Sequence, residues 1–143
     1  MENKYFTPNI EDFHVGYEYE HEDIIPSGSS DYFKSVISKP SEIEHLFQGF
    51  DVGIGIRVPY LTREQIEAEG WYKINNNYPI QTFKHPINVN VEVIYNYDTN
   101  YLFITIPGKI MFTEPKIEYR ASKFSGKCKD INTFRKICKL LEI

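Results

Sequence analysis

The chain has 143 residues and a mass of 16.9 kDa, and 41% of its residues are hydrophobic and 15% aromatic. This length suits one ordinary globular domain, which buries roughly 68–70% of the surface that its unfolded chain exposes. No apolar run approaches the length of about eighteen residues that spans a membrane, and the first residues lack the basic and then apolar pattern of a secretory signal. We therefore expect a cytoplasmic protein without membrane contact.

The net charge of −4 is unevenly distributed along the chain. Residues 1–50 carry three basic and ten acidic side chains, residues 51–115 carry five and seven, and residues 116–143 carry eight and three. A basic C-terminal region could attract a phosphorylated ligand. It could also pack against the acidic N-terminal region or form an ordinary solvated surface. Because acidic residues dominate elsewhere, we expect weak or no binding to long nucleic acid.

The first clear element is a strand over residues 13–22. Apolar and charged residues alternate there, so Tyr17 and Tyr19 should face one side and Glu18 and Glu20 the other. The high aromatic content of the chain favours strands in general.

The next segments carry weaker signals. Residues 25–31 read as a Ser/Gly loop, residues 32–38 fit a strand or a helix, and residues 41–49 predict one or two helical turns closed by Gly49. Residues 52–60 alternate as a strand in which Gly53 and Gly55 let another backbone or a ligand approach closely.

Residues 62–70 have the clearest local signature. Thr62 is placed as an N-cap, Gln65 as its capping-box partner and Gly70 as the left-handed stop, which predicts a helix of about two turns. After Trp71 the pattern becomes β, with turns at residues 75–77, 98–100 and 107–108 and a last strand ending near residue 128.

The C-terminal segment predicts an amphipathic helix after a turn at Asp130. One apolar stripe at helical spacing comprises Ile131, Phe134, Ile137, Cys138 and Leu141. Such a stripe needs a sheet to cover. The fold class is therefore α+β: one domain over residues 1–143 with a mainly antiparallel, twisted sheet of six or seven strands, the C-terminal helix on one face and one short capped helix.

The two cysteines, Cys128 and Cys138, read as reduced packing thiols, with a disulfide between them as the less favoured alternative.

Three blocks of the sequence, residues 5–18, 57–71 and 126–143, resemble small accessory proteins encoded by tailed phages, prophages and Bacteroidota genomes. Together they cover about a third of the chain. The resemblance implies a phage accessory protein, which would act in the host cytoplasm. It brings no catalytic residues that could be carried over.

Catalytic and metal-binding patterns are weak. No pair of histidines has the spacing of a helical zinc site, and the glutamates of the 13–22 strand are more typical of a solvated edge than of a cation site. A hydrolase could draw on Glu18 or Glu20 with Glu92 or Glu118, but nothing in the sequence brings them together. We predict no catalytic residue, metal or cofactor.

The favoured function is a non-enzymatic binding protein, such as a counter-defence factor, that binds or sequesters a small phosphorylated ligand or a host protein. The candidate ligand-binding residues are Arg57, Arg120 and Lys123 for phosphate, and Tyr17, Tyr19 and Trp71 for stacking. Two alternatives stay open: an adaptor that forms a homo-oligomer through a β edge, and a small hydrolase.

Overall fold

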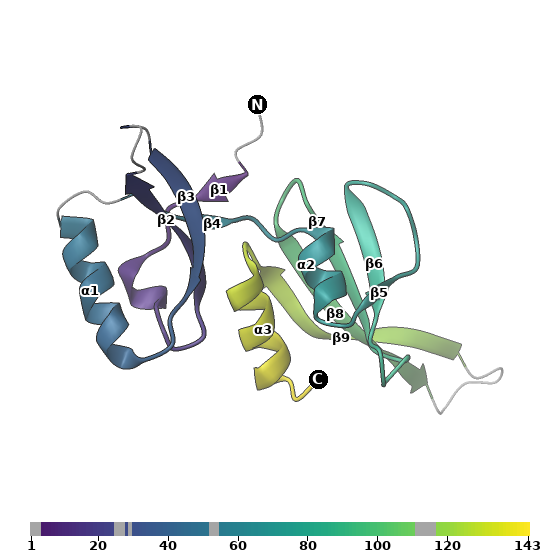
Figure 1. The fold of residues 1–143 in the computed structure, drawn as a ribbon. Helices are drawn as coiled ribbons and strands as arrows, with labels where there is room; N and C mark the ends of the chain where they lie inside the picture. Colours follow the sequence, from purple (N-terminus) through teal and green to yellow (C-terminus); the bar gives the residue numbers. More distant parts are fainter. Residues whose placement is uncertain (1–3, 25–27, 29, 52–54, 111–116) are drawn as a thin grey trace. The chain divides into compact units, whose positions relative to one another are not determined.

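The computed structural model describes residues 4–24, 28, 30–51, 55–110 and 117–143 (Figure 1). The predicted α+β class is confirmed: the described strands form two antiparallel sheets, one of four and one of five strands, accompanied by helices. The chain divides into two compact units, Met1–Tyr60 (unit 1) and Leu61–Ile143 (unit 2). The strands expected in one sheet are thus shared between two. That residues 1–143 form a single domain stays a prediction.

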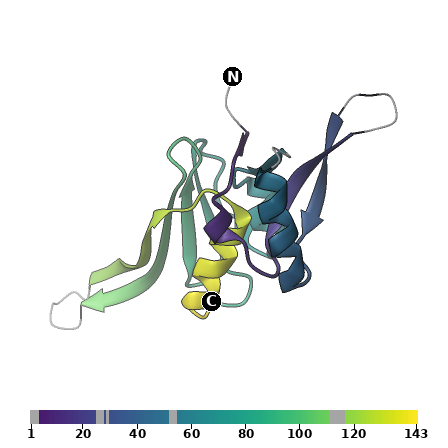
Figure 2. The same cartoon turned by 90° about the vertical axis from the view of Figure 1, so that its left-hand side faces the viewer.

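Unit 1 has a four-stranded sheet covered by one helix. The strand order is β1-β4-β2-β3, with β1 at Tyr5–Phe6, β2 at Glu18–Ile24, β3 at Ser30–Val36 and β4 at Ile56–Pro59. A 3-10 turn, η1, spans Ile10–Asp12, and helix α1 spans Pro40–Asp51. Figure 2 shows α1 along one face of the sheet, where Ile43 and Leu46 pack on Ile37, Ile56 and Val58.

The strand pairing in unit 1 decides between strand and helix for residues 32–38. Residues 32–36 belong to β3, which pairs with β2 along its whole length, Glu18 opposite Val36 and Ile24 opposite Ser30. Helix α1 is longer than predicted and continues past Gly49, because packing of its apolar face outweighs the cost of about 1 kcal/mol for one glycine. Gly53 lies outside the described residues.

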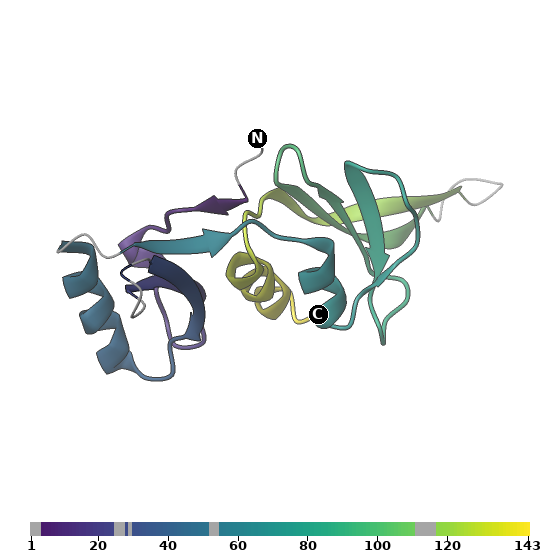
Figure 3. The ribbon, with the colours of Figure 1, turned by 45° about the horizontal axis from the view of Figure 1, so that its top comes forward.

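Unit 2 is a five-stranded meander with two helices on one face. The order β5-β6-β7-β8-β9 follows the chain, with β5 at Tyr72–Lys73, β6 at Ile80–Lys84, β7 at Glu92–Asn96, β8 at Tyr101–Ile110 and β9 at Ile117–Lys127. Helices α2, Arg63–Ala68, and α3, Ile131–Leu140, lie side by side over this sheet (Figure 3). None of the described helices is both long and apolar enough to cross a lipid bilayer.

The predicted stripe of α3 forms the centre of the unit 2 core. Ile131, Phe134 and Ile137 are buried against inner-face strand residues such as Phe83 and Ile104. Asp130 caps the helix by accepting a hydrogen bond from the Thr133 amide at 3.1 Å. The sequence pattern and the packing therefore agree.

The predicted capping box of α2 is also present. The Thr62 hydroxyl accepts from the Gln65 amide at 3.2 Å, and the Gln65 side chain accepts from the Thr62 amide at 3.0 Å. Gly70 ends this segment with φ +94°, a conformation that a residue with a Cβ rarely adopts. The chain then leads directly into Trp71 and β5, so the cap fixes where Trp71 enters the core.

Candidate functional site

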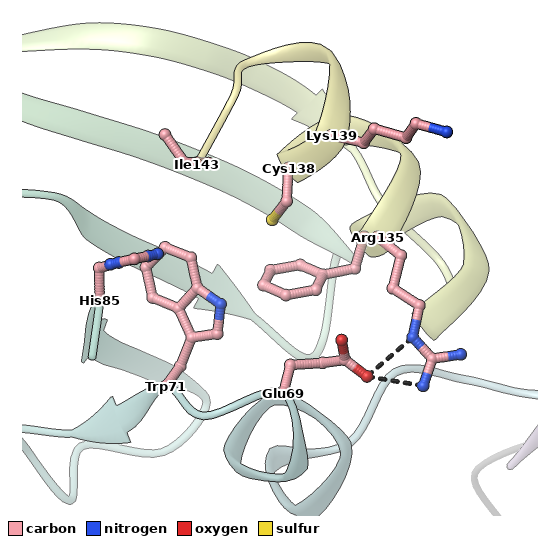
Figure 4. Close-up of a pocket in the computed structure, with 8 residues that line it drawn as sticks. Glu69, Trp71, His85, Arg135, Cys138, Lys139 and Ile143 are labelled. Atoms are coloured by element: carbon pink, nitrogen blue, oxygen red, sulfur yellow. Dashed lines mark hydrogen bonds and ion pairs between the residues drawn. The ribbon is translucent and has the colours of Figure 1, made fainter. Parts of the chain in front are cut away.

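A cavity of about 250 Å³ lies in unit 2 between the end of α2, the start of β5, the end of β6 and the second half of α3 (Figure 4). Eight residues line it: Glu69, Trp71, His85, Phe134, Arg135, Cys138, Lys139 and Ile143. The rings of Trp71, Phe134 and His85 form an aromatic wall, while Glu69, Arg135 and Lys139 bring charged groups, so more of the exposed lining is polar than apolar. Aromatic side chains combined with a few polar groups in a concave site are typical of small-ligand sites.

The aromatic wall is fixed by edge-to-face contacts. The Trp71 ring meets His85 at a centroid distance of 4.9 Å and an interplanar angle of 88°, and Phe134 at 5.9 Å and 72°. Trp71 is buried as well, so its position follows from the packing of the core. A wall built in this way is preorganised for a flat apolar group.

An ion pair joins the two helices beside the cavity. Arg135 Nε donates to Glu69 Oε1 at 2.7 Å, and Arg135 Nη2 lies 2.6 Å from the same oxygen. The Arg135 side chain is 39% exposed and that of Glu69 28%. Figure 4 shows the Lys139 side chain directed away from Trp71 and the Arg135 guanidinium turned toward Glu69.

His85 links the cavity to the loop that follows β6. Its Nδ1 accepts hydrogen bonds from the amides of Ile87 at 3.1 Å and Asn88 at 2.9 Å. An imidazole nitrogen accepts only when it carries no proton, so the neutral ring has its proton on Nε2. His85 therefore supports the loop and contributes its ring to the wall.

Cys138 brings a thiol into the cavity, but the surroundings suppress its ionisation. Figure 4 shows the side chain directed toward the indole of Trp71. Burial, and secondarily the nearby charge of Glu69, raise the pKa of Cys138 to about 12. Because the thiolate is the reactive form, Cys138 acts here as an apolar lining group.

Three of the predicted ligand-binding residues lie in unit 1. Tyr17 is buried in the core, and Tyr19 packs against the same core on the face opposite Glu20, as the alternation predicted. Arg57 is sandwiched between Tyr5 and Tyr32, its Cζ 3.7 Å from each ring centroid, and its Nε donates to Glu20 at 2.6 Å. Both faces of the guanidinium are thus occupied by the protein itself.

Gly55, which directly precedes β4, is closely approached by other groups, as predicted. A Cβ placed there would lie 2.6 Å from Glu22 Oε2 and 2.7 Å from the Tyr32 hydroxyl. The groups that approach are side chains of β2 and β3 beside the Arg57 sandwich. The missing side chain at Gly55 therefore makes room for Glu22 and Tyr32, which are side chains of the protein itself.

The other three predicted residues lie in unit 2. Trp71 lines the cavity. Arg120, on β9, donates to Thr105 Oγ1 at 2.8 Å and to the Asn90 carbonyl at 2.8 Å, and lies 3.5 Å from Glu92. Lys123 is the extra residue of a β-bulge, because Phe124 pairs with Ile104 and Ser122 with Thr105. The ligand role of these six residues stays a prediction.

Most of the cavity was not foreseen from the sequence. Arg135 and Lys139 counted only as part of the basic C-terminal region, and Glu69, His85 and Cys138 were not proposed as ligand contacts. One available signal was the spacing of Arg135, Cys138 and Lys139, which places them on one side of a helix. Nothing local indicated that Glu69 and Arg135, 66 positions apart, would meet.

No three His, Cys, Asp or Glu side chains gather to hold a metal ion in the part of the chain that the structure describes. Comparison of the chain with protein-family models, with curated proteins and with solved structures found no match.

Proposed function

We propose that the protein is a non-enzymatic binding protein whose cavity receives the ring of a small phosphorylated ligand, with the phosphate at Arg135. The observation that carries the proposal is an aromatic wall beside a half-exposed arginine. The resemblance to phage accessory proteins adds a context, sequestration of a nucleotide signal used in host defence, and that context rests on the resemblance alone.

Size supports a ring-sized occupant. An apolar cavity of about 150 Å³ accommodates benzene, and pockets for drug-sized molecules begin at about 300 Å³. A cavity of about 250 Å³ falls between these values, so it suits one base or a similar ring and leaves a charged group outside. Arg135 lines the cavity with a side chain that is 39% exposed, and arginine can bind phosphate with two parallel hydrogen bonds.

The polar groups of the cavity favour binding over catalysis. A thiol, an imidazole and a carboxylate all line it, which are the residue types of a cysteine hydrolase. The Cys138 pKa is raised instead of lowered, and His85 Nδ1 is occupied by two amides. These features oppose a nucleophile and base pair, so the hydrolase alternative is disfavoured.

The adaptor alternative would use a β edge. Strand β9 has eleven residues and ends the five-stranded sheet, so it offers the longest such edge among the described strands. It is interrupted by the bulge at Lys123, and bulges and lysines on edge strands hinder pairing with another chain. A small ligand is therefore preferred to oligomerisation through β9.

The test is calorimetry with a panel of mononucleotides and cyclic nucleotides on the wild type and three variants. Arg135→Ala should weaken binding at least tenfold, because a charge-assisted contact is lost. Glu69→Gln should strengthen it several-fold, because the carboxylate that competes with phosphate for Arg135 is removed. Lys136→Ala, an exposed cation of the same helix that does not line the cavity, should leave affinity unchanged.

Two outcomes would contradict the proposal. One is the absence of binding to every nucleotide of the panel. The other is an equal loss of affinity in Arg135→Ala and Lys136→Ala, which would mean that the total positive charge of the helix matters and the position of Arg135 does not. Native mass spectrometry of the purified protein complements this test, since it reports retained ligand and oligomeric state together.

A further inference from the structure

The sheet of unit 2 has a second face, opposite the helices. Directly paired residues share a face, so the register assigns to it the rows Lys84–Glu92–Thr105–Ser122, Thr82–Ile94–Phe103–Ser125 and Ile80–Asn96–Tyr101–Lys127. Tyr72, paired with Lys84, continues the first row. We call these residues, with Arg120, the outer face. Buried residues of the core point to the other side of the sheet, toward α2 and α3.

The outer face exposes aromatic rings on a rigid support. Phe103 is 39% and Tyr72 44% exposed. Phe103 lies on β8, inside the sheet, and its ring centroid is 4.9 Å from that of Tyr101. The Tyr101 hydroxyl is held 3.1 Å from Ser125 Oγ. A tilted pair of rings anchored on a central strand provides flat surfaces for stacking.

Positive charge borders the aromatic pair. Lys84, Arg120 and Lys127 stand on this face, and Glu92 is its one acid among the side chains that the structure describes. Lys127 Nζ donates to the Thr99 carbonyl at 2.6 Å, which is a neutral acceptor, and it forms no ion pair with a carboxylate among the side chains that the structure describes. Unit 2 as a whole has twelve basic and nine acidic residues, whereas unit 1 has four and eleven.

We infer that the outer face is a binding surface for single-stranded nucleic acid. Cations in line with exposed rings match a strand of phosphates with unpaired bases, because bases stack on the rings while lysine and arginine contact the backbone. Arg120 and Lys127 are seven residues apart on β9, about 23 Å at ~3.3 Å per residue. That length corresponds to a short site of about four nucleotides. A duplex keeps its bases stacked inside and should not bind here.

The experiment is fluorescence anisotropy of the whole protein with short labelled oligothymidine and oligouridine over a salt series. Arg120 is already paired with Glu92, so the two lysines, Lys84 and Lys127, predict a slope of log affinity against log salt of about −1.4, which is about sevenfold between 50 and 200 mM salt. Phe103→Ala should weaken binding about tenfold or more, and Phe103→Trp, which keeps the stacking surface, should bind as the wild type does. Phe47→Ala removes an equally exposed ring on α1 and should have no effect.

A second pair of variants tests the contribution of positive charge to this binding. Lys127→Ala should lower the salt slope by about 0.7, the value for one phosphate contact of a single strand, and Lys136→Ala should not. The inference is overturned if Phe103→Ala and the wild type bind the single strand with equal affinity, or if the wild type binds a duplex as tightly as a single strand. Binding of polyglutamate as tight as that of the single strand would also overturn it and would indicate an acidic protein partner. The cavity variants Arg135→Ala and Glu69→Gln test the proposed function separately, because those residues lie outside the outer face.

Discussion

The two units stabilise similar sheets by different means. The core of unit 2 contains thirteen buried residues in one cluster, whereas that of unit 1 contains five, counted over the described residues. Unit 1 compensates on the other face of its sheet, where Arg57 is stacked between two tyrosines and paired with Glu20. The small unit therefore relies on a polar arrangement where the larger unit relies on apolar burial.

The same contrast separates two arginines that resemble each other in the sequence. Arg57 and Arg135 each bind one glutamate, at 2.6 Å by the nearest atoms. Tyrosine rings cover both faces of Arg57, while Arg135 stands beside a cavity. The surroundings of the two arginines therefore differ although each is paired with a glutamate.

The largest effect should come from the apolar core of unit 2. Phe134→Ala should reduce the free energy of unfolding by about 3–5 kcal/mol, because Phe134 is fully buried between α3 and the sheet. Urea unfolding can be followed by the fluorescence of Trp71, the one tryptophan, whose ring is 5.9 Å from that of Phe134. A decrease in the free energy of unfolding of less than about 1 kcal/mol would show that Phe134 contributes little to the stability of the core.

The polar arrangement of unit 1 should give the next effect. Arg57→Ala should cost about 1–3 kcal/mol, because it leaves the nearly buried Glu20 without its partner and removes two cation–π contacts. Arg63→Ala, which breaks a pair exposed on the surface of α2, is the control and should cost less than about 1 kcal/mol.

Arg57→Ala also tests the single-domain prediction. Trp71 reports on unit 2 alone, while circular dichroism reports on the helices of both units. We expect the two signals to shift together, as unfolding of one cooperative domain requires. A shift in circular dichroism without a shift in fluorescence would mean that the units unfold separately.

A smaller effect should follow from the helix cap that precedes Trp71. Thr62→Ala should cost about 0.5–2 kcal/mol, because the Gln65 amide loses its side-chain acceptor. Thr62→Ser retains the hydroxyl and should be close to neutral. Equal stability of the alanine variant and wild type in urea would show that the cap contributes nothing to unit 2.

The weakest effect concerns the thiols of unit 2. Burial raises the pKa of both cysteines, that of Cys138 to about 12, so alkylation of the native protein at neutral pH should be slow. Both cysteines are free, so a thiol titration of the denatured protein without reductant should find two thiols. Ionisation favours the unfolded chain, whose thiol pKa is about 8.5, so stability should fall as the pH rises from there toward 12. Rapid modification of the native protein at pH 7 would contradict this picture.

Several elements were predictable from signals that lie within a few residues of one another, although the turn predicted at residues 107–108 is wrong because both residues pair within β8. The Thr62 to Gln65 capping box, the Gly70 stop and the α3 stripe are correct because caps, turns and helical faces depend on neighbours three or four positions away. The alternation likewise predicted that Tyr19 and Glu20 face opposite sides of the sheet. The α+β class followed from these local patterns.

The way in which those elements combine depends on contacts that exist only in the folded chain. The division into two sheets, the extension of α1 beyond Gly49 and the pairing of Glu69 with Arg135 depend on contacts between distant residues, which no local spacing encodes. Of the six residues proposed for a ligand, the fold brings Trp71 to the cavity and encloses Arg57 between tyrosines. A side chain carries its chemistry from the sequence, but its access to a ligand depends on burial and on long-range partners, which arise only when the chain folds.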